Sequence, residues 1–158
     1  MTPDDERFLA RAIALSQETL KGGPGGPFGA VVARDGQLLG EGFNQVTLAN
    51  DPTAHAEVVA IRDACRRAGD YALTGATIYA SCEPCPMCLG AILWARIDRL
   101  VYANSRDEAA QAGFNDADFW AEARAWPNAR RLVCEHQPRE AARAVFDGWT
   151  RKADRIEY

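Results

Sequence analysis

Three cysteines stand at two-residue gaps in the stretch S-C-E-P-C-P-M-C-L-G, residues 81 to 90. A histidine and a glutamate, His55 and Glu57, precede them in the stretch T-A-H-A-E-V. Imidazole nitrogen and thiolate sulfur are ligands of Zn²⁺, and a catalytic zinc site has three protein ligands with the fourth position left to water. The spacing therefore predicts that His55, Cys85 and Cys88 bind one Zn²⁺ per chain.

Glu57 is predicted to be the catalytic residue and not a fourth ligand. In a regular helix its side chain lies about 200° around the axis from that of His55. A carboxylate in this place can take a proton from metal-activated water and return it to a leaving group. Such an arrangement serves the hydrolytic removal of an amine from an amidine-like carbon.

Two other kinds of metal site compete with this interpretation. Cys82 could supply a fourth ligand to a structural zinc in a binding module without turnover, but a structural site has no use for Glu57. The C-x-x-C-x-x-C spacing is also half of an iron–sulfur pattern, but no fourth cysteine follows at the right spacing. The pattern favours a catalytic zinc site, and it leaves open whether Cys82 competes for the metal and whether Glu83 lines the pocket.

The elements that must position these residues follow from the apolar periodicity. Their order predicts an α/β fold, a single three-layer α/β/α domain over residues 1–158 with helices on both faces of a mixed five-stranded sheet. The expected elements are a helix from Thr2 to the glycines at 22–23, a hairpin of 28–34 and 37–44, a helix from Thr53 to near Gly69, a strand at 76–81, a helix at 87–96, strands at 99–103 and 131–134, and a final helix containing 142–149.

Composition limits the classes of function. The chain has 158 residues, 47% of them hydrophobic and 25% charged, which fits one globular domain that needs no disulfides. The net charge of −4 disfavours a nucleic-acid partner. The acidic start and the short longest apolar run, 88–95, predict neither a signal peptide nor a membrane span, so we expect a cytoplasmic protein with reduced thiols.

The pattern H-A-E with P-C-x-x-C resembles the signature of the cytidine deaminase superfamily of zinc deaminases. Within it the chain is most similar to the small bacterial guanine deaminases, in the stretches G-G-P-F-G-A-V, N-D-P-T-A-H-A-E-V, S-C-E-P-C-P-M-C-L-G-A-I-L-W-A-R, A-G-F-N-D and I-E-Y. The resemblance implies a cytidine-deaminase-like fold and a hydrolase acting on cyclic amidines. It would convert guanine to xanthine and ammonia, with zinc-bound hydroxide as the nucleophile and Glu57 as the proton shuttle.

The same resemblance implies five substrate-binding residues: Phe28 stacking on the base, Asn44 bonding to it, Trp94 walling the pocket, Asp116 reading the purine or moving protons, and Tyr158 closing the site. From the residues alone, Phe28 and Trp94 could equally pack in the core. Asn44 could belong to a turn, and Asp116 could cap the following helix. A C-terminal tyrosine is more often disordered than functional.

The implied assembly is a homodimer in which the C-terminal segment 138–158 is exchanged between subunits. The expected partner is a small purine base, with no nucleic acid and no membrane. Two alternatives stay open within the superfamily, namely a deaminase of guanosine or another amino-heterocycle such as an aminotriazine, and a tRNA adenosine deaminase. The latter shares both motifs but needs a basic face, which the net charge of −4 does not favour.

Overall fold

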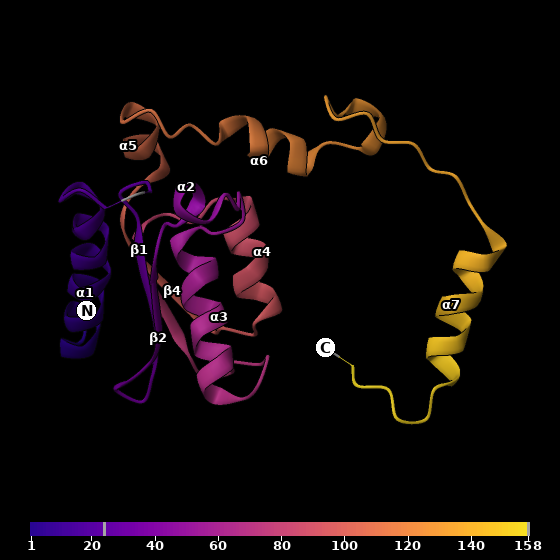
Figure 1. Cartoon of the computed structure of the whole chain (residues 1–158), viewed down its shortest axis with the longest axis horizontal. Coiled ribbons are helices and arrows are strands. Elements are labelled where there is room, and N and C mark those ends of the chain that lie inside the picture. Colours follow the sequence, from indigo (N-terminus) through magenta and orange to yellow (C-terminus); the bar gives the residue numbers. More distant parts are fainter. Residues whose placement is uncertain (24, 158) are drawn as a thin grey trace. The chain divides into compact units, whose positions relative to one another are not determined.

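The first helix begins where its capping residues predict. The computed structural model describes residues 1–23 and 25–157, and its helix α1 spans Pro3–Leu20 (Figure 1). The Asp5 N–H donates to Oγ1 of Thr2, and the Thr2 N–H donates to Oδ2 of Asp5 at 2.9 Å. These reciprocal bonds form a capping box, which satisfies backbone donors that the first helical turn leaves unpaired.

Four strands form one mixed sheet in the order β2-β1-β3-β4. They are β1 (Gly29–Arg34), β2 (Gln37–Phe43), β3 (Thr77–Cys82) and β4 (Arg99–Asn104). Strand β1 is antiparallel to β2 and β3, whereas β3 and β4 are parallel. The turn between β1 and β2 has positive φ at both central residues, 51° at Asp35 and 72° at Gly36, as a two-residue hairpin turn requires. The predicted hairpin and mixed sheet are confirmed.

The expected fifth strand is wrong. Residues 131–134 form no strand, and within the described part of the chain the sheet has four strands. The Arg131 N–H instead donates to the carboxylate of Glu122, and the Leu132 and Val133 side chains are 70% and 83% exposed. The apolar residues at 132–134 are a short signal, and a strand forms only where a neighbouring strand accepts its backbone hydrogen bonds.

Helices cover both faces of the sheet, as Figure 1 shows for α1 on one side and for α3 (Ala56–Ala68) and α4 (Pro86–Trp94) on the other. Alternate residues of β1 point to opposite faces. On one face Val31 and Ala33 pack against α1, and on the other Ala30 and Val32 pack in the cluster that includes residues of α3 and α4. The predicted three-layer α/β/α arrangement is therefore confirmed.

The backbone of helix α3 packs directly against strand β2, because the residues of β2 that face the helix are glycines. A β-carbon at Gly42 would lie 2.7 Å from the Ala60 nitrogen and 2.8 Å from the Ala56 oxygen, and one at Gly40 would lie 2.4 Å from the Ala64 nitrogen. Only glycine permits this approach. The two glycines therefore determine where α3, and the residues at its start, lie above the sheet.

A buried carboxylate joins α1 to the sheet. Asp5 is 1% exposed; its Oδ1 accepts from the Tyr79 hydroxyl at 2.9 Å, and the Arg99 guanidinium donates to both of its oxygens, at 2.6 and 3.0 Å. Hydrogen bonds from Arg99, and next from Thr2, hold the pKa of this carboxyl well below its ordinary value. The ion pair ties the helix start to β3 and β4.

The chain divides into two compact units, Met1–Trp120 and the residues from Ala121 onward. The remaining helices are α2 (Val46–Ala49), α5 (Arg106–Gln111), α6 (Ala117–Arg124), the 3₁₀ helix η1 (Pro127–Ala129) and α7 (Glu140–Arg151). Among residues 1–23 and 25–157, none of the helices has an apolar stretch long enough to cross a membrane.

Candidate active site

Two helix starts bring the predicted metal ligands together. His55 is the N-cap residue of α3, Cys85 is the N-cap residue of α4, and Cys88 lies in the first turn of α4. The sequence predicted that this helix starts at Thr53, and that start is wrong: the Thr53 N–H and hydroxyl both bond to Oδ1 of Asp51 in the preceding turn. As the N-cap residue, His55 has extended backbone, with φ −67° and ψ 154°, and lies just outside the helix.

The three ligand atoms form a nearly equilateral triangle. Nδ1 of His55 lies 3.6 Å from Sγ of Cys85 and 3.5 Å from Sγ of Cys88, and the two sulfur atoms are 3.6 Å apart. A tetrahedral ion with Zn–S about 2.3 Å and Zn–N about 2.0 Å requires separations of about 3.5 Å for S–N and about 3.8 Å for S–S. The donor types and their spacing both fit Zn²⁺ with a fourth position outside the triangle.

The two thiols and the imidazole are strongly coupled to one another. Hydrogen bonds with Cys88 and with His55 lower the pKa of Cys85 to about 4. The bond with Cys85 and burial raise the pKa of Cys88, and the neighbouring negative charges of Glu57 and Cys85 raise it further. The hydrogen bond with Cys85 raises the pKa of His55. A divalent cation would offset the repulsion between two thiolates, so this cluster is suited to hold one.

Glu57 lies beside the triangle and is almost fully buried, with 8% of its surface exposed. Burial raises the pKa of its carboxyl, and the negative charge of Cys85 acts in the same direction. Because Glu57 is in the first turn of α3, the position of His55 also determines the position of this carboxylate. A buried carboxyl with increased proton affinity can accept and return a proton.

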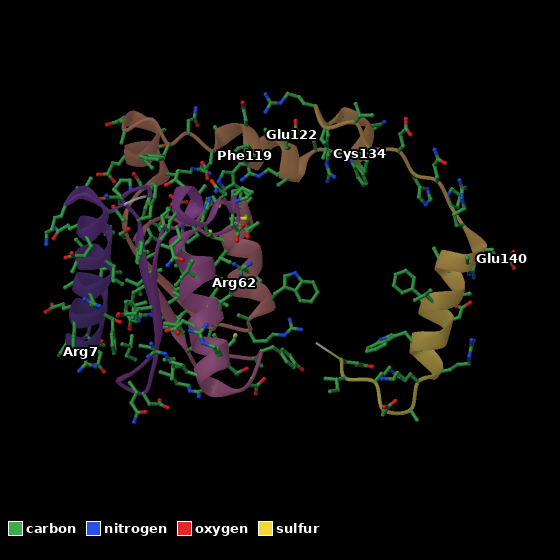
Figure 2. The ribbon with its side chains drawn as sticks, viewed as in Figure 1. Arg7, Arg62, Phe119, Glu122, Cys134 and Glu140 are labelled. Carbon is green, nitrogen blue, oxygen red and sulfur yellow. The ribbon has the colours of Figure 1, made fainter. Side chains whose placement is uncertain are left out.

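A cavity of about 340 Å³ opens over the triangle, near the low end of the range for small-molecule sites. Its walls include aromatic rings from different elements: Phe28 and Phe114 pack edge to face with centroids 4.9 Å apart, and Phe119, labelled in Figure 2, projects from α6. The cavity is lined by Gly26, Phe28, Asn44, Val46, Thr47, His55, Glu57, Cys82, Glu83, Cys85, Arg106, Ala109, Phe114, Asp116 and Phe119.

Asn44 lines this cavity, and its side-chain oxygen is held by the backbone. It directly follows β2, and its Oδ1 accepts from the backbone N–H groups of Gly26, at 3.3 Å, and Val46, at 3.2 Å. Because the side-chain oxygen is engaged by the backbone, the amide NH₂ is the end available to a ligand.

The other predicted substrate residues differ in where they lie. Asp116 lines the cavity, and its Oδ2 accepts a hydrogen bond from Nε1 of Trp120 at 3.0 Å. Trp94, in contrast, is 62% exposed at the end of α4, with the Arg96 guanidinium 5.9 Å from its ring centroid, and it is not among the described residues that line the cavity. Tyr158 lies outside the described residues.

The positions of Cys82 and Glu83 bear on the two questions about the loop before α4. Cys82 lines the cavity, but it is not part of the ligand triangle; its Sγ donates to the Ser105 carbonyl at 3.7 Å. Burial raises the pKa of the Cys82 thiol to about 11, which favours the neutral form. Glu83 also lines the cavity, and its Oε2 accepts from the Arg106 N–H at 3.1 Å.

Several lining residues were not predicted from the sequence, namely Thr47, Arg106, Phe114 and Phe119. Phe114 lies in the A-G-F-N-D stretch that carries the resemblance, which was a usable signal. Arg106 and Phe119 lie on the short helices α5 and α6, whose approach to the cavity no local pattern indicates.

The geometry fits a zinc-binding centre with a buried carboxylate beside it, and comparison with known proteins gives the class of enzyme. Residues 2–104 match the family model for the cytidine and deoxycytidylate deaminase zinc-binding region. The chain belongs to this family.

Several known proteins are similar to this chain, and they differ in the share of the chain over which the similarity extends. A guanine deaminase of Bacillus subtilis (strain 168) is 46% identical over 97% of this chain and 98% of its own length. The X-ray structure of guanine deaminase from Bacillus subtilis superimposes with a TM-score of 0.94 at 45% identity, covering 100% of this chain and 99% of that one.

Two further relatives are less similar. A tRNA-specific adenosine deaminase of Haemophilus influenzae is 41% identical over 64% of this chain and 58% of its own length. A crystal structure of a NE0047 mutant in complex with 8-azaguanine has a TM-score of 0.68 at 30% identity, covering 72% of this chain and 65% of that one.

Proposed function

We propose that this protein is a zinc-dependent aminohydrolase that converts guanine to xanthine and ammonia. The observation that carries the proposal is the triangle of His55, Cys85 and Cys88 with the buried Glu57 beside it, at the base of an aromatic cavity. The choice of guanine is supported by the similarity to a guanine deaminase over almost the whole of both chains. The similarity to the tRNA-specific enzyme covers a smaller share of each chain.

His55, Cys85 and Cys88 would hold one Zn²⁺ per chain. The ion would supply the Lewis acidity that makes water a nucleophile at neutral pH. Glu57 takes a proton from the attacking water and delivers it to the departing amino group. A carbon–oxygen bond forms at the ring carbon, the carbon–nitrogen bond breaks, and the nitrogen leaves as ammonia.

The cavity walls would orient the ring. Phe28 and Phe114 supply apolar surface for a planar heterocycle. The Asn44 amide donates to a ring acceptor, and the Asp116 carboxylate accepts from ring N–H groups, so the two together suit a base with both kinds of group. Guanine has a carbonyl oxygen and N–H donors on its edges. The contacts of Trp94 and Tyr158 with the substrate stay predictions.

We further propose a homodimer in which segment 138–158 is exchanged. Within the second unit, α7 has apolar side chains that are exposed, Val145 at 69%, Phe146 at 75% and Trp149 at 42%. An apolar helix face of this kind normally packs against another surface. Sedimentation equilibrium tests this proposal, since a monomeric mass at micromolar concentration would contradict it.

We also propose that the protein works in the cytoplasm and has no nucleic-acid partner. All five cysteines are unpaired thiols, a state that a reducing compartment preserves. The net charge is −4, and the cavity is lined by three carboxylates, from Glu57, Glu83 and Asp116, with a single cationic side chain, Arg106, among the described lining residues. This charge distribution does not favour binding of a polyanion.

The substitution Glu57→Gln tests the mechanism, because it retains the shape of the side chain and removes the proton acceptor. We expect it to bind zinc and to fold like the wild type, and to release ammonia from guanine 10²–10⁴-fold more slowly, the usual contribution of general acid–base catalysis. Glu18→Gln, an exposed residue of α1, is the matched control and should retain full activity. Wild-type turnover by Glu57→Gln would refute the mechanism.

The substrate is tested by measuring ammonia release from guanine, guanosine, adenine, cytosine and an aminotriazine, and inosine formation in tRNA. We expect guanine to have the highest kcat/KM. Turnover of tRNA alone would replace the proposed function with tRNA adenosine deamination, and a preference for guanosine or the aminotriazine would replace guanine as the substrate.

A further inference from the structure

The carboxylate of Asp116 is held by a tryptophan that has no part in the mechanism described above. Asp116 lines the cavity directly before α6, and its Oδ2 accepts from Nε1 of Trp120 at 3.0 Å. Trp120 lies one helical turn further along the same segment. An indole has a single N–H, which can only donate. This bond therefore orients one oxygen of the carboxylate and leaves Oδ1 for a donor in the cavity.

The indole ring is held in turn from a second element. The guanidinium carbon of Arg106 lies 5.7 Å from the centroid of the Trp120 ring, within the range of a cation–π contact. Arg106 is the first residue of α5, and its backbone N–H donates to Oε2 of Glu83 at 3.1 Å. Glu83 belongs to the short loop between β3 and Cys85. Three successive contacts thus connect the loop before Cys85 with Asp116.

We propose that Trp120 is a positioning residue for the purine: its N–H orients Asp116 so that Oδ1 meets the ring N–H groups, and Arg106 holds the indole in that place. The inference rests on the proposed function, since Asp116 matters here as an acceptor for the substrate. Without the indole N–H, the carboxylate would have to be ordered each time the ring binds, which weakens binding.

The substitution Trp120→Phe removes the N–H and retains an aromatic ring beneath Arg106. We expect about 10-fold weaker binding of 8-azaguanine and about 10-fold lower kcat/KM for guanine, as for the loss of a hydrogen bond to a charged group. Zinc content and Tm should stay those of the wild type. Trp126→Phe, the same change at a side chain that is 80% exposed in the second unit, is the matched control and should retain wild-type affinity.

A double-mutant cycle separates this role from a merely structural one. In the Asp116→Ala background, Trp120→Phe should have no further effect on 8-azaguanine affinity, because the tryptophan acts through the carboxylate. An equal loss in both backgrounds would overturn the inference. So would wild-type affinity in Trp120→Phe when Asp116→Ala binds weakly, or wild-type affinity in Asp116→Ala itself.

Failure of the proposed function gives a different result. In that case the wild-type protein neither binds 8-azaguanine nor releases ammonia from guanine. A crystal structure of Trp120→Phe then decides the positioning role by itself. A displaced or split Asp116 side chain supports it, and an Asp116 carboxylate in its wild-type orientation overturns it.

Discussion

A single methyl group on β2 should disturb both the packing and the metal site. In Gly42→Ala, the new β-carbon would lie 2.7 Å from the Ala60 nitrogen, 2.8 Å from the Ala56 oxygen and 2.8 Å from Cβ of Val59. Favourable non-bonded contacts begin at about 3.5 Å, so α3 must move away from the sheet by about 0.7 Å. Two of the three contacted atoms belong to the helix backbone, which cannot turn aside as a side chain would.

The expected cost has two parts. Overpacking typically destabilises by about 1–3 kcal/mol, and we expect the upper end because backbone is displaced. The second part concerns zinc, because α3 begins at Ala56 and its N-cap residue is His55. A metal site tolerates errors of about 0.2 Å in ligand distance, so a shift of His55 relative to the two cysteines should lower zinc affinity by about 10-fold or more.

Urea unfolding with excess chelator measures the packing cost, and competition with a chromophoric chelator measures zinc affinity. Gly90→Ala is the matched control on α4, since nothing lies within 4 Å of a β-carbon at Gly90. It should be neutral or more stable by up to about 1 kcal/mol, because alanine is the better helix former. Wild-type stability of Gly42→Ala would refute the packing argument, and reduced stability with unchanged zinc affinity would refute the coupling between α3 and the metal site.

Two further predictions concern single side chains. Cys82→Ser should leave zinc content and zinc affinity unchanged, because Cys82 donates to Ser105 and lies outside the ligand triangle; loss of metal would show that Cys82 is a ligand after all. Because the pKa of Asp5 is depressed in the folded state, its contribution to stability is present above the unfolded pKa of about 3.9 and is lost as pH falls below it. Urea unfolding between about pH 6 and pH 2.5 should therefore show a steeper loss of stability in the wild type than in Asp5→Asn, whereas parallel curves would contradict the role of the Arg99 ion pair.

The candidate zinc ligands could be predicted from the sequence because two of them lie close together in the chain. Cys85 and Cys88 are three residues apart at a helix start, so a single turn brings both sulfur atoms to one side. His55 was recognisable by its residue type and by Glu57 two positions on. The four longer helices, the hairpin and β3 and β4 were likewise predicted from local periodicity and turn residues, whereas the short helices α2, α5, α6 and η1 were not among the expected elements and the strand expected at 131–134 is absent.

The sequence by itself determined the residue types of the candidate metal ligands, the proton acceptor two positions after His55 and the longer helices and strands, because residue types and short-range spacing carry these features. Only the tertiary structure decided that residues 131–134 form no strand, that Cys82 is outside the ligand triangle and that Trp94 is not among the described residues that line the cavity. The contacts of Trp120 with Asp116 and Arg106 belong to the same group. Whether a strand forms, a thiol binds metal or an indole orients a carboxylate depends on the partners that folding brings from distant segments, and no local pattern encodes their distances.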